Sequence, residues 1–165
     1  ARAPDAAARL RLKWPNDLLV DGAKLAGILV EGETLPDGTF SVAVGIGVNC
    51  ISHPSDAPYP ATDLERVGFP SDKAALLREL GAAMPRRLAQ WRGGEAFGEI
   101  RADWLLRTAQ LGEQVRVRSA QEIHGGFAGI DEHGRLLLAM PDGVLRTFAA
   151  GDLHLSGPAR GQGAS

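Results

Sequence analysis

The first 50 residues alternate between apolar and polar positions in the two-residue period of half-buried β-strands. Residues 9–13 show this alternation, and residues 40–49 show it again. Between them, residues 18–20 and 25–30 are short apolar runs joined by Asp21-Gly22, a dipeptide that favours a tight hairpin turn. The pattern predicts three or four antiparallel strands that follow one another in the sequence.

Residues 71–110 change to the three- and four-residue spacing of amphipathic helices, with their apolar sides expected against a sheet. Ser71 is the predicted N-cap of a first helix, and Pro85 is expected to kink or divide it. Gly93-Gly94 separates this helix from a second one over residues 95–109. The apolar positions are Leu76, Leu77, Leu80, Met84, Leu88 and Trp91 in the first helix, and Phe97, Ile100 and Trp104 in the second.

The last third of the chain returns to short strands separated by turns. Four strands are predicted, over residues 115–118, 126–130, 135–139 and 144–149, and strands at this spacing suggest a small barrel. The glycine-rich tail over residues 157–165 is expected to be disordered. We therefore expect an α+β fold: a mostly antiparallel sheet with packed helices over residues 1–110, then a small all-β barrel over residues 111–156.

The composition excludes some classes of function. Hydrophobic residues make up 44% of the chain and charged residues 23%, which is ordinary globular usage. No apolar run approaches the roughly 20 residues of a membrane helix. The net charge is -2, and neither the part before Leu111 nor the part from it onward is basic, so we expect neither a membrane nor a nucleic acid as partner of this segment. The chain begins with alanine rather than methionine, so we expect it to be incomplete at its N-terminus.

Cysteine and histidine usage argues against a structural metal site. The single Cys50 cannot form an intrachain disulfide and fits a reducing, cytoplasmic setting. Its place at the end of an apolar strand predicts a buried thiol rather than a nucleophile. The four histidines are scattered without ligand spacing, at positions 53, 124, 133 and 154.

Two charged residues stand at the starts of the two hairpin strands. Asp17 opens the first, and Lys24 opens the second, so the hairpin brings them within a few residues of facing each other. Such pairs are mostly surface ion pairs worth about 0–1 kcal/mol, and the spacing alone leaves that interpretation open. Gly45 and Gly47 leave room for a ligand or for another backbone, and Asn49 suits a purine edge or a turn.

Three short motifs occur in order between Lys13 and Asn49. They are Lys13-Trp14-Pro15-Asn16-Asp17, Lys24-Leu25-Ala26-Gly27-Ile28-Leu29-Val30-Glu31 and Gly45-Ile46-Gly47-Val48-Asn49. Together they resemble the signature of the biotin protein ligases. The resemblance implies a catalytic domain of the class II synthetase and biotin/lipoate ligase type, followed by a Src-homology-3-type barrel that Gly129-Ile130-Asp131 also matches. Residues 60–64 resemble the family's Ala-Thr-Ser-Leu step, with Asp63 in place of serine.

The resemblance implies a reaction in two steps, with ATP, biotin and Mg²⁺. Biotin is first adenylated, and it is then transferred to a lysine of a biotin carboxyl carrier protein of the acetyl-CoA carboxylase type. Lys24 is the implied catalytic cation. Asp17 would orient Lys24, hold Mg²⁺ or accept a proton, and the sequence does not separate these roles.

The same resemblance implies the residues that bind the substrates. Asn16 and Asn49 would contact the adenylate, and Lys13 would contact phosphate or a neighbouring loop. Ala26 and Gly27 would bring backbone close to biotin, and Gly45 and Gly47 would allow a close approach of the ligand.

Two alternatives and two open questions remain at this stage. A lipoate ligase runs the same adenylation chemistry, although the complete Lys13–Asp17 box argues against it. The chain could also be an inactive part of a ligase that only binds a carrier protein, because no Gly- and Arg-rich loop precedes Lys13. A homodimer is possible through free sheet edges, and the sequence says nothing about a DNA-binding domain upstream.

Overall fold

The computed structural model describes residues 6–56, 59–118, 121–149 and 151–155, which form two compact units. One unit ends at Ala96, and the other begins at Phe97. This division falls before the domain boundary predicted at residue 110, because helix α3 (Phe97–Leu105) contacts strand β6 (Glu122–Ile130) of the second unit. The predicted tail over residues 157–165 lies outside the described residues.

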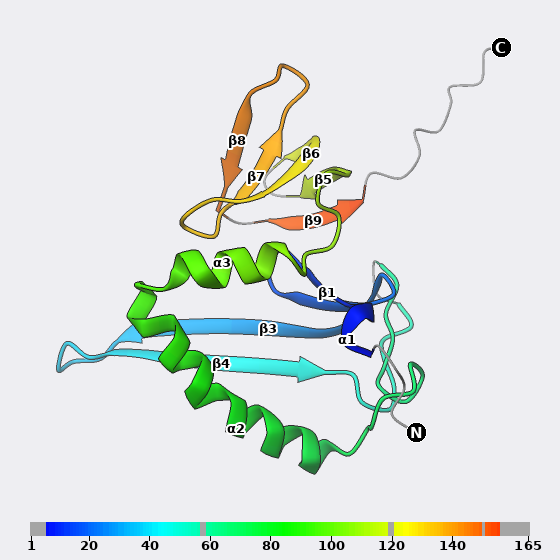
Figure 1. The fold of residues 1–165 in the computed structure, drawn as a ribbon, viewed down its shortest axis with the longest axis vertical. Helices are drawn as coiled ribbons and strands as arrows, with labels where there is room; N and C mark the ends of the chain where they lie inside the picture. The colour runs from blue at the N-terminus through cyan, green and yellow to red at the C-terminus, as the bar shows by residue number, and fades with distance from the viewer. Residues whose placement is uncertain (1–5, 57–58, 119–120, 150, 156–165) are drawn as a thin grey trace. The chain divides into compact units, whose positions relative to one another are not determined.

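The first unit is built on a four-stranded antiparallel sheet in the order β1-β2-β3-β4 (Figure 1). A short helix α1 (Ala6–Arg9) precedes the strands, which are β1 (Leu10–Lys13), β2 (Asp17–Val20), β3 (Ala23–Thr34) and β4 (Phe40–Val48). The expected turn at Asp21-Gly22 is present, with φ values of 50° and 81°. Positive φ at both positions is what a tight two-residue hairpin turn requires. The predicted succession of antiparallel strands is confirmed.

The core of this unit lies where the sheet meets the segment that follows β4. Its buried members are Val20, Leu25, Cys50 and Leu64. Leu18 and Val48 from the strands and Leu76 from the first long helix are among the partly buried residues that pack against them. The thiol of Cys50 is therefore a core group, as its place in an apolar run predicts.

Helix α2 (Lys73–Trp91) begins one residue later than predicted. Its N-cap is Asp72 rather than Ser71, because the Asp72 carboxylate accepts hydrogen bonds from the backbone N–H groups of Ala74 and Ala75, at 2.9 and 3.1 Å. Pro85 lies inside the helix and does not divide it. The helix is followed by a 3-10 turn, η1 (Arg92–Gly94).

The apolar stripe of α2 is only partly covered. Leu76 packs on the core, whereas the side chains of Leu77 and Leu88 remain 72% and 54% exposed. The expectation that the whole stripe packs against a sheet is therefore wrong. The outer part of the β3–β4 hairpin also exposes apolar side chains, among them Leu29, Val30, Phe40 and Val42.

The second unit places α3 beside a five-stranded antiparallel sheet in the order β8-β7-β6-β5-β9. Its strands are β5 (Gln114–Arg118), β6, β7 (Leu136–Ala139), β8 (Leu145–Phe148) and β9 (Asp152–Leu155). All four predicted strands are present, and β9, which pairs with β5, is the additional one. The predicted α+β fold class is confirmed. No helix in the described part of the chain is long and apolar enough to span a membrane.

Candidate functional site

The strand register places four of the predicted site residues in one row across the first sheet. Lys13 of β1 lies opposite Asp17 of β2, Asp17 lies opposite Gly27 of β3, and Gly27 lies opposite Gly47 of β4. Directly opposed residues project from the same face of an antiparallel sheet. Two charged side chains and two glycines therefore share one face of the sheet.

Lys24 joins this row through its long side chain. Its backbone partner is Leu19, and an irregularity between Leu18 and Leu19 shifts the register there. The Lys24 ammonium nevertheless reaches the Asp17 carboxylate, with 2.6 Å between Nζ and Oδ1. Lys13 Nζ lies 3.4 Å from the other oxygen, Oδ2. The structure thus brings Asp17 and Lys24 into contact, as the predicted hairpin requires, and adds Lys13 to the pair.

The three charged groups of this cluster differ in their access to solvent. The side chains of Asp17 and Lys13 are only 5% and 7% exposed, whereas that of Lys24 is 34% exposed. Two ammoniums and one carboxylate leave the cluster with one net positive charge. Lys24 is therefore the cation that a negatively charged ligand could reach. Lys13 is buried and adds a second positive charge next to Asp17.

The surroundings keep Asp17 and Lys24 ionised. Burial by itself raises the pKa of Asp17, but hydrogen bonds from Lys24 and Tyr59, with the charge of Lys13, outweigh burial and lower it. Burial by itself lowers the pKa of Lys24, but its hydrogen bonds to Asp17 and Tyr59 raise it. Asp17 is therefore held as a carboxylate and Lys24 as an ammonium.

Tyr59 is a member of this cluster that sequence reasoning missed. Its hydroxyl donates a hydrogen bond to Asp17 Oδ2 at 2.7 Å and accepts one from Lys24 Nζ at 3.1 Å. Lys13 Nζ lies 4.4 Å from the centroid of its ring. Tyr59 is the only tyrosine of the chain and stands between two prolines in an irregular segment. Those features mark it in the sequence, but they do not predict its contacts.

Backbone hydrogen bonds hold the segment that carries Tyr59, residues 59–62, against strand β3. The backbone N–H of Lys24 donates to the carbonyl of Pro60 at 2.8 Å, and the N–H of Thr62 donates to the carbonyl of Lys24 at 2.9 Å. The side-chain amide of Asn49 also donates to the Thr62 carbonyl, at 2.9 Å. Asn49 thus ties the segment to the end of β4, and its predicted contact with an adenylate stays a prediction.

Asn16 also makes a contact within the protein. Its side-chain amide donates to the carbonyl of Ile28 at 2.7 Å, and the N–H of Ile28 donates back to the Asn16 carbonyl at 2.9 Å. The exposed side chain of Asn16 is therefore fixed at the entry to strand β2. Its predicted contact with an adenylate remains a prediction.

Gly27, Gly45 and Gly47 leave a stretch of bare backbone next to the cluster, called here the glycine floor, and the exposed side chain of Leu29, opposite Gly45, borders it. A Cβ atom at Gly27 would lie 3.4 Å from Lys24 Nζ and 3.5 Å from Asp17 Oδ1. At Gly45 and Gly47 it would meet only the neighbouring strand, at 3.7 Å or more. Ala26 projects from the opposite face, where it is 5% exposed, so only its backbone borders this floor.

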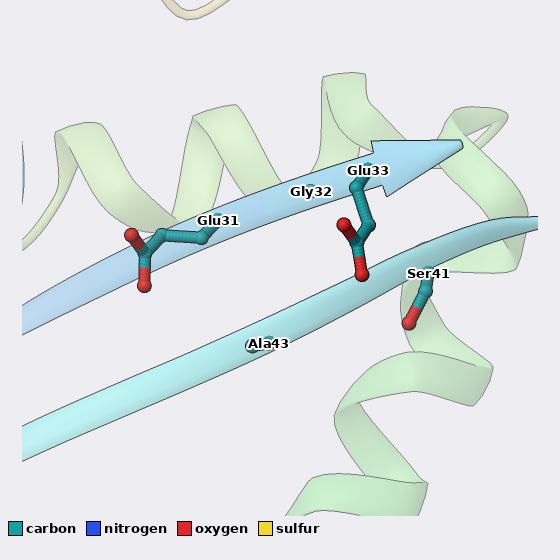
Figure 2. Close-up of a pocket in the computed structure, with 5 residues that line it drawn as sticks. All are labelled: Glu31, Gly32, Glu33, Ser41 and Ala43. Atoms are coloured by element: carbon teal, nitrogen blue, oxygen red, sulfur yellow. The ribbon is translucent and has the colours of Figure 1, made fainter. Parts of the chain in front are cut away.

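A shallow pocket of about 210 Å³ lies further along the same hairpin (Figure 2). Glu31, Gly32 and Glu33 of β3 and Ser41 and Ala43 of β4 line it. The register puts Glu31 opposite Ala43 and Glu33 opposite Ser41, on the same face as Gly27 and Gly47. Its two glutamates make it acidic, unlike the cationic cluster at the start of β3.

The residues around Asp17 do not suit a magnesium ion. Both carboxylate oxygens already face ammoniums, and Oδ2 also accepts the Tyr59 hydroxyl. Mg²⁺ requires several oxygen ligands in octahedral geometry, and two adjacent cations oppose it. Among the described residues there is also no group of three or more His, Cys, Asp or Glu side chains that could hold a metal.

The chain is an α+β protein whose antiparallel sheet carries a lysine–aspartate cluster beside the glycine floor. A small β unit follows this sheet in the sequence. Both parts match known protein families. Residues 3–49 match the Biotin/lipoate A/B protein ligase family. Residues 111–155 match the Biotin protein ligase C terminal domain. The chain belongs to the biotin protein ligase family.

Several proteins are similar to most of this chain. The biotin--[acetyl-CoA-carboxylase] ligase of Paracoccus denitrificans is 42% identical over 144 residues, which cover 83% of this chain and 60% of the relative. The enzyme of the same name from Mycobacterium tuberculosis is 35% identical over 151 residues, which cover 87% of this chain and 53% of the relative. The biotin protein ligase from Aquifex aeolicus in complex with biotin and ATP has a TM-score of 0.72 and 26% identity, with 89% of this chain and 62% of that one covered. The chain thus spans less than two thirds of each of these relatives.

Proposed function

We propose that the chain carries the adenylation site of an ATP-dependent biotin protein ligase. In the first step, a carboxylate oxygen of biotin attacks the α-phosphorus of ATP, and pyrophosphate leaves. In the second, the ε-amine of a lysine on a carrier protein attacks the acyl carbon of biotinyl-adenylate, and AMP leaves. The observation that supports this most is the partly exposed Lys24 ammonium, which Asp17 fixes at 2.6 Å beside the glycine floor.

A fixed cation at this position would lower the barriers of both steps. Negative charge builds up on the α-phosphate oxygens in the first step, and on the acyl oxygen and leaving phosphate in the second. A fixed ammonium needs no reorganisation when this charge develops, so it stabilises the transition states more than the substrates. Lys24 takes this role because it is the cation of the cluster that a ligand can reach.

Of the three roles open for Asp17, orientation of Lys24 fits the geometry best. The lowered pKa of Asp17 makes its carboxylate a weak base toward an incoming lysine. The two neighbouring ammoniums oppose a metal ion there. In this proposal, Mg²⁺ comes with ATP, whose phosphates it binds, and Asp17 holds the Lys24 ammonium in place.

In this proposal, biotin binds on the glycine floor. Gly27, Gly45 and Gly47 lie on the face that carries Lys13 and Asp17, so a flat bicyclic ring could lie against bare backbone with its carboxylate toward Lys24. The backbone of Ala26 borders the same place. We assign Asn16 and Asn49 to the adenylate side of the site, and Lys13 to support of the Asp17–Lys24 ion pair.

The protein partner in this proposal is a biotin carboxyl carrier protein of the acetyl-CoA carboxylase type, in the cytoplasm. Support comes from two of the relatives, whose names state that they act on acetyl-CoA carboxylase.

The test of this function is biotin-dependent exchange of labelled pyrophosphate into ATP, with lipoate as the control substrate. Exchange measures the first step alone and needs no carrier protein. Exchange with biotin and none with lipoate would support the proposal. Exchange with lipoate instead would identify a lipoate-specific enzyme. No exchange with either, in a folded chain, would favour the alternative in which this part of a ligase only binds a carrier protein.

A further inference from the structure

Tyr59 contacts all three charged members of the cluster, although it belongs to none of the three motifs. Its hydroxyl bridges Asp17 Oδ2 and Lys24 Nζ, at 2.7 and 3.1 Å. Its ring faces Lys13 Nζ at 4.4 Å and Lys24 Nζ at 5.6 Å from the centroid. One side chain therefore engages both ammoniums and the carboxylate that pairs with them.

These contacts fix the direction of the Lys24 ammonium. An ion pair between a lysine and a carboxylate leaves the ammonium able to swing, because a lysine side chain is long and its charge is a point charge. A second acceptor removes that freedom: Nζ donates to Asp17 Oδ1 and to Tyr59 Oη, and the described residues offer its third proton no other acceptor. That proton can therefore be donated to a ligand.

The ring of Tyr59 acts on Lys13. The Lys13 side chain is 7% exposed and lies 3.4 Å from Asp17 Oδ2, which is a long distance for a charge-assisted hydrogen bond. The face of an aromatic ring stabilises a poorly solvated ammonium. The hydroxyl of Tyr59 thus acts on Lys24, whereas its ring lies nearer to Lys13 than to Lys24, so substitution can separate the two effects.

We propose that Tyr59 is a positioning residue that fixes the two lysine ammoniums of the site around Asp17, with its hydroxyl acting on Lys24 and its ring on Lys13. The consequence for catalysis rests on the proposed function, whereas the positioning itself does not. The segment that carries Tyr59 is tied to strand β3 by the backbone of Lys24 itself. Movement of this segment would therefore change the site at its catalytic cation.

The test is the rate at which each lysine ammonium exchanges its protons with water, measured by ¹H–¹⁵N NMR at mildly acidic pH. The chain has three lysines, Lys13, Lys24 and Lys73, and exposed Lys73 on helix α2 is the internal control. In the unaltered chain we expect slower exchange at Lys24 and Lys13 than at Lys73. Tyr59→Phe should raise exchange at Lys24 by about tenfold, since it removes a hydrogen bond to a charged group, and should leave Lys13 much less affected.

Tyr59→Leu removes the ring as well and should also accelerate exchange at Lys13. Backbone amide spectra show whether each variant is folded. Lysine exchange that stays unchanged in both folded variants would overturn the proposal, and so would equally fast exchange of Lys24 and Lys73 in the unaltered chain. Loss of folding in Tyr59→Leu leaves Tyr59→Phe to decide the role of the hydroxyl.

A kinetic measurement connects this positioning to the reaction. In pyrophosphate exchange, Tyr59→Phe should lower kcat by about tenfold and leave the KM for biotin within about twofold, because only the transition-state interaction of Lys24 is weakened. An unchanged kcat would contradict a positioning role in catalysis. If the unaltered chain shows no exchange, the proposed function fails its own test, and the ammonium measurement still decides the role of Tyr59.

Discussion

At the scale of residues, the buried carboxylate of Asp17 is the centre of the site. It is the shared partner of Lys13, Lys24 and Tyr59, and no other described carboxylate faces two lysines. The sequence points to Asp17 and Lys24 through the resemblance to the biotin protein ligases, because their positions at the starts of hairpin strands also fit an ordinary surface ion pair. It does not identify Tyr59, because that contact depends on how an irregular segment folds back on β3.

The first prediction concerns the pH dependence of stability. Asp17→Asn should lower the free energy of unfolding by about 2 kcal/mol near neutral pH, because it leaves two lysines without their carboxylate. The pKa of Asp17 in the folded chain lies below its ordinary value of 3.8. The contribution of Asp17 is therefore fully present above pH 3.8, and it is lost as the pH falls through the lower folded value.

Urea unfolding at several pH values, followed by the fluorescence of the three tryptophans, which include buried Trp14, measures this difference. The two proteins should differ by a constant amount from pH 5 to 7 and converge in acid. A difference that persists unchanged far below pH 3.8, or that grows there, would contradict the ion-pair role of Asp17.

At the scale of elements, alternation and turn dipeptides predict most of the strands. Asp21-Gly22 sets the β2–β3 hairpin, and strand β4 lies where the alternation of residues 40–49 places it. Strand β9 was missed because it is short and pairs with β5, which is distant in the sequence. The exposure of Leu77 and Leu88 could not be predicted either, because periodicity shows which side of a helix is apolar and not whether anything covers it.

The second prediction compares two leucines of neighbouring strands in the second unit. Leu138 of β7 is fully buried, whereas Leu145 of β8 is 58% exposed. Leu138→Ala should cost about 2–5 kcal/mol of unfolding free energy, because it leaves a cavity in the core, and Leu145→Ala should cost less than about 0.5 kcal/mol. Urea unfolding followed by circular dichroism measures both. Similar costs for the two variants would show that the register of this sheet is wrong.

At the scale of the whole chain, the site combines parts that the family matches cover with a part that they do not. Lys13, Asp17 and Lys24 lie in the matched residues 3–49, whereas Tyr59 lies between the two matched ranges. The chain also spans only 60% of the Paracoccus relative. The motifs could therefore be assigned from the sequence, but the segment that completes the cluster required the structure.

The most direct test of the account is pyrophosphate exchange with Lys24→Ala, compared with Lys73→Ala as the matched lysine control. Removal of a fixed cation from a developing negative charge should lower the biotin-dependent rate by about 10²–10³-fold, and the Lys73 variant should keep the rate of the unaltered chain. Both variants should remain folded. If exchange proceeds in the unaltered chain and Lys24→Ala keeps a rate within about twofold of it, then Lys24 is not the catalytic cation and the proposed site is wrong.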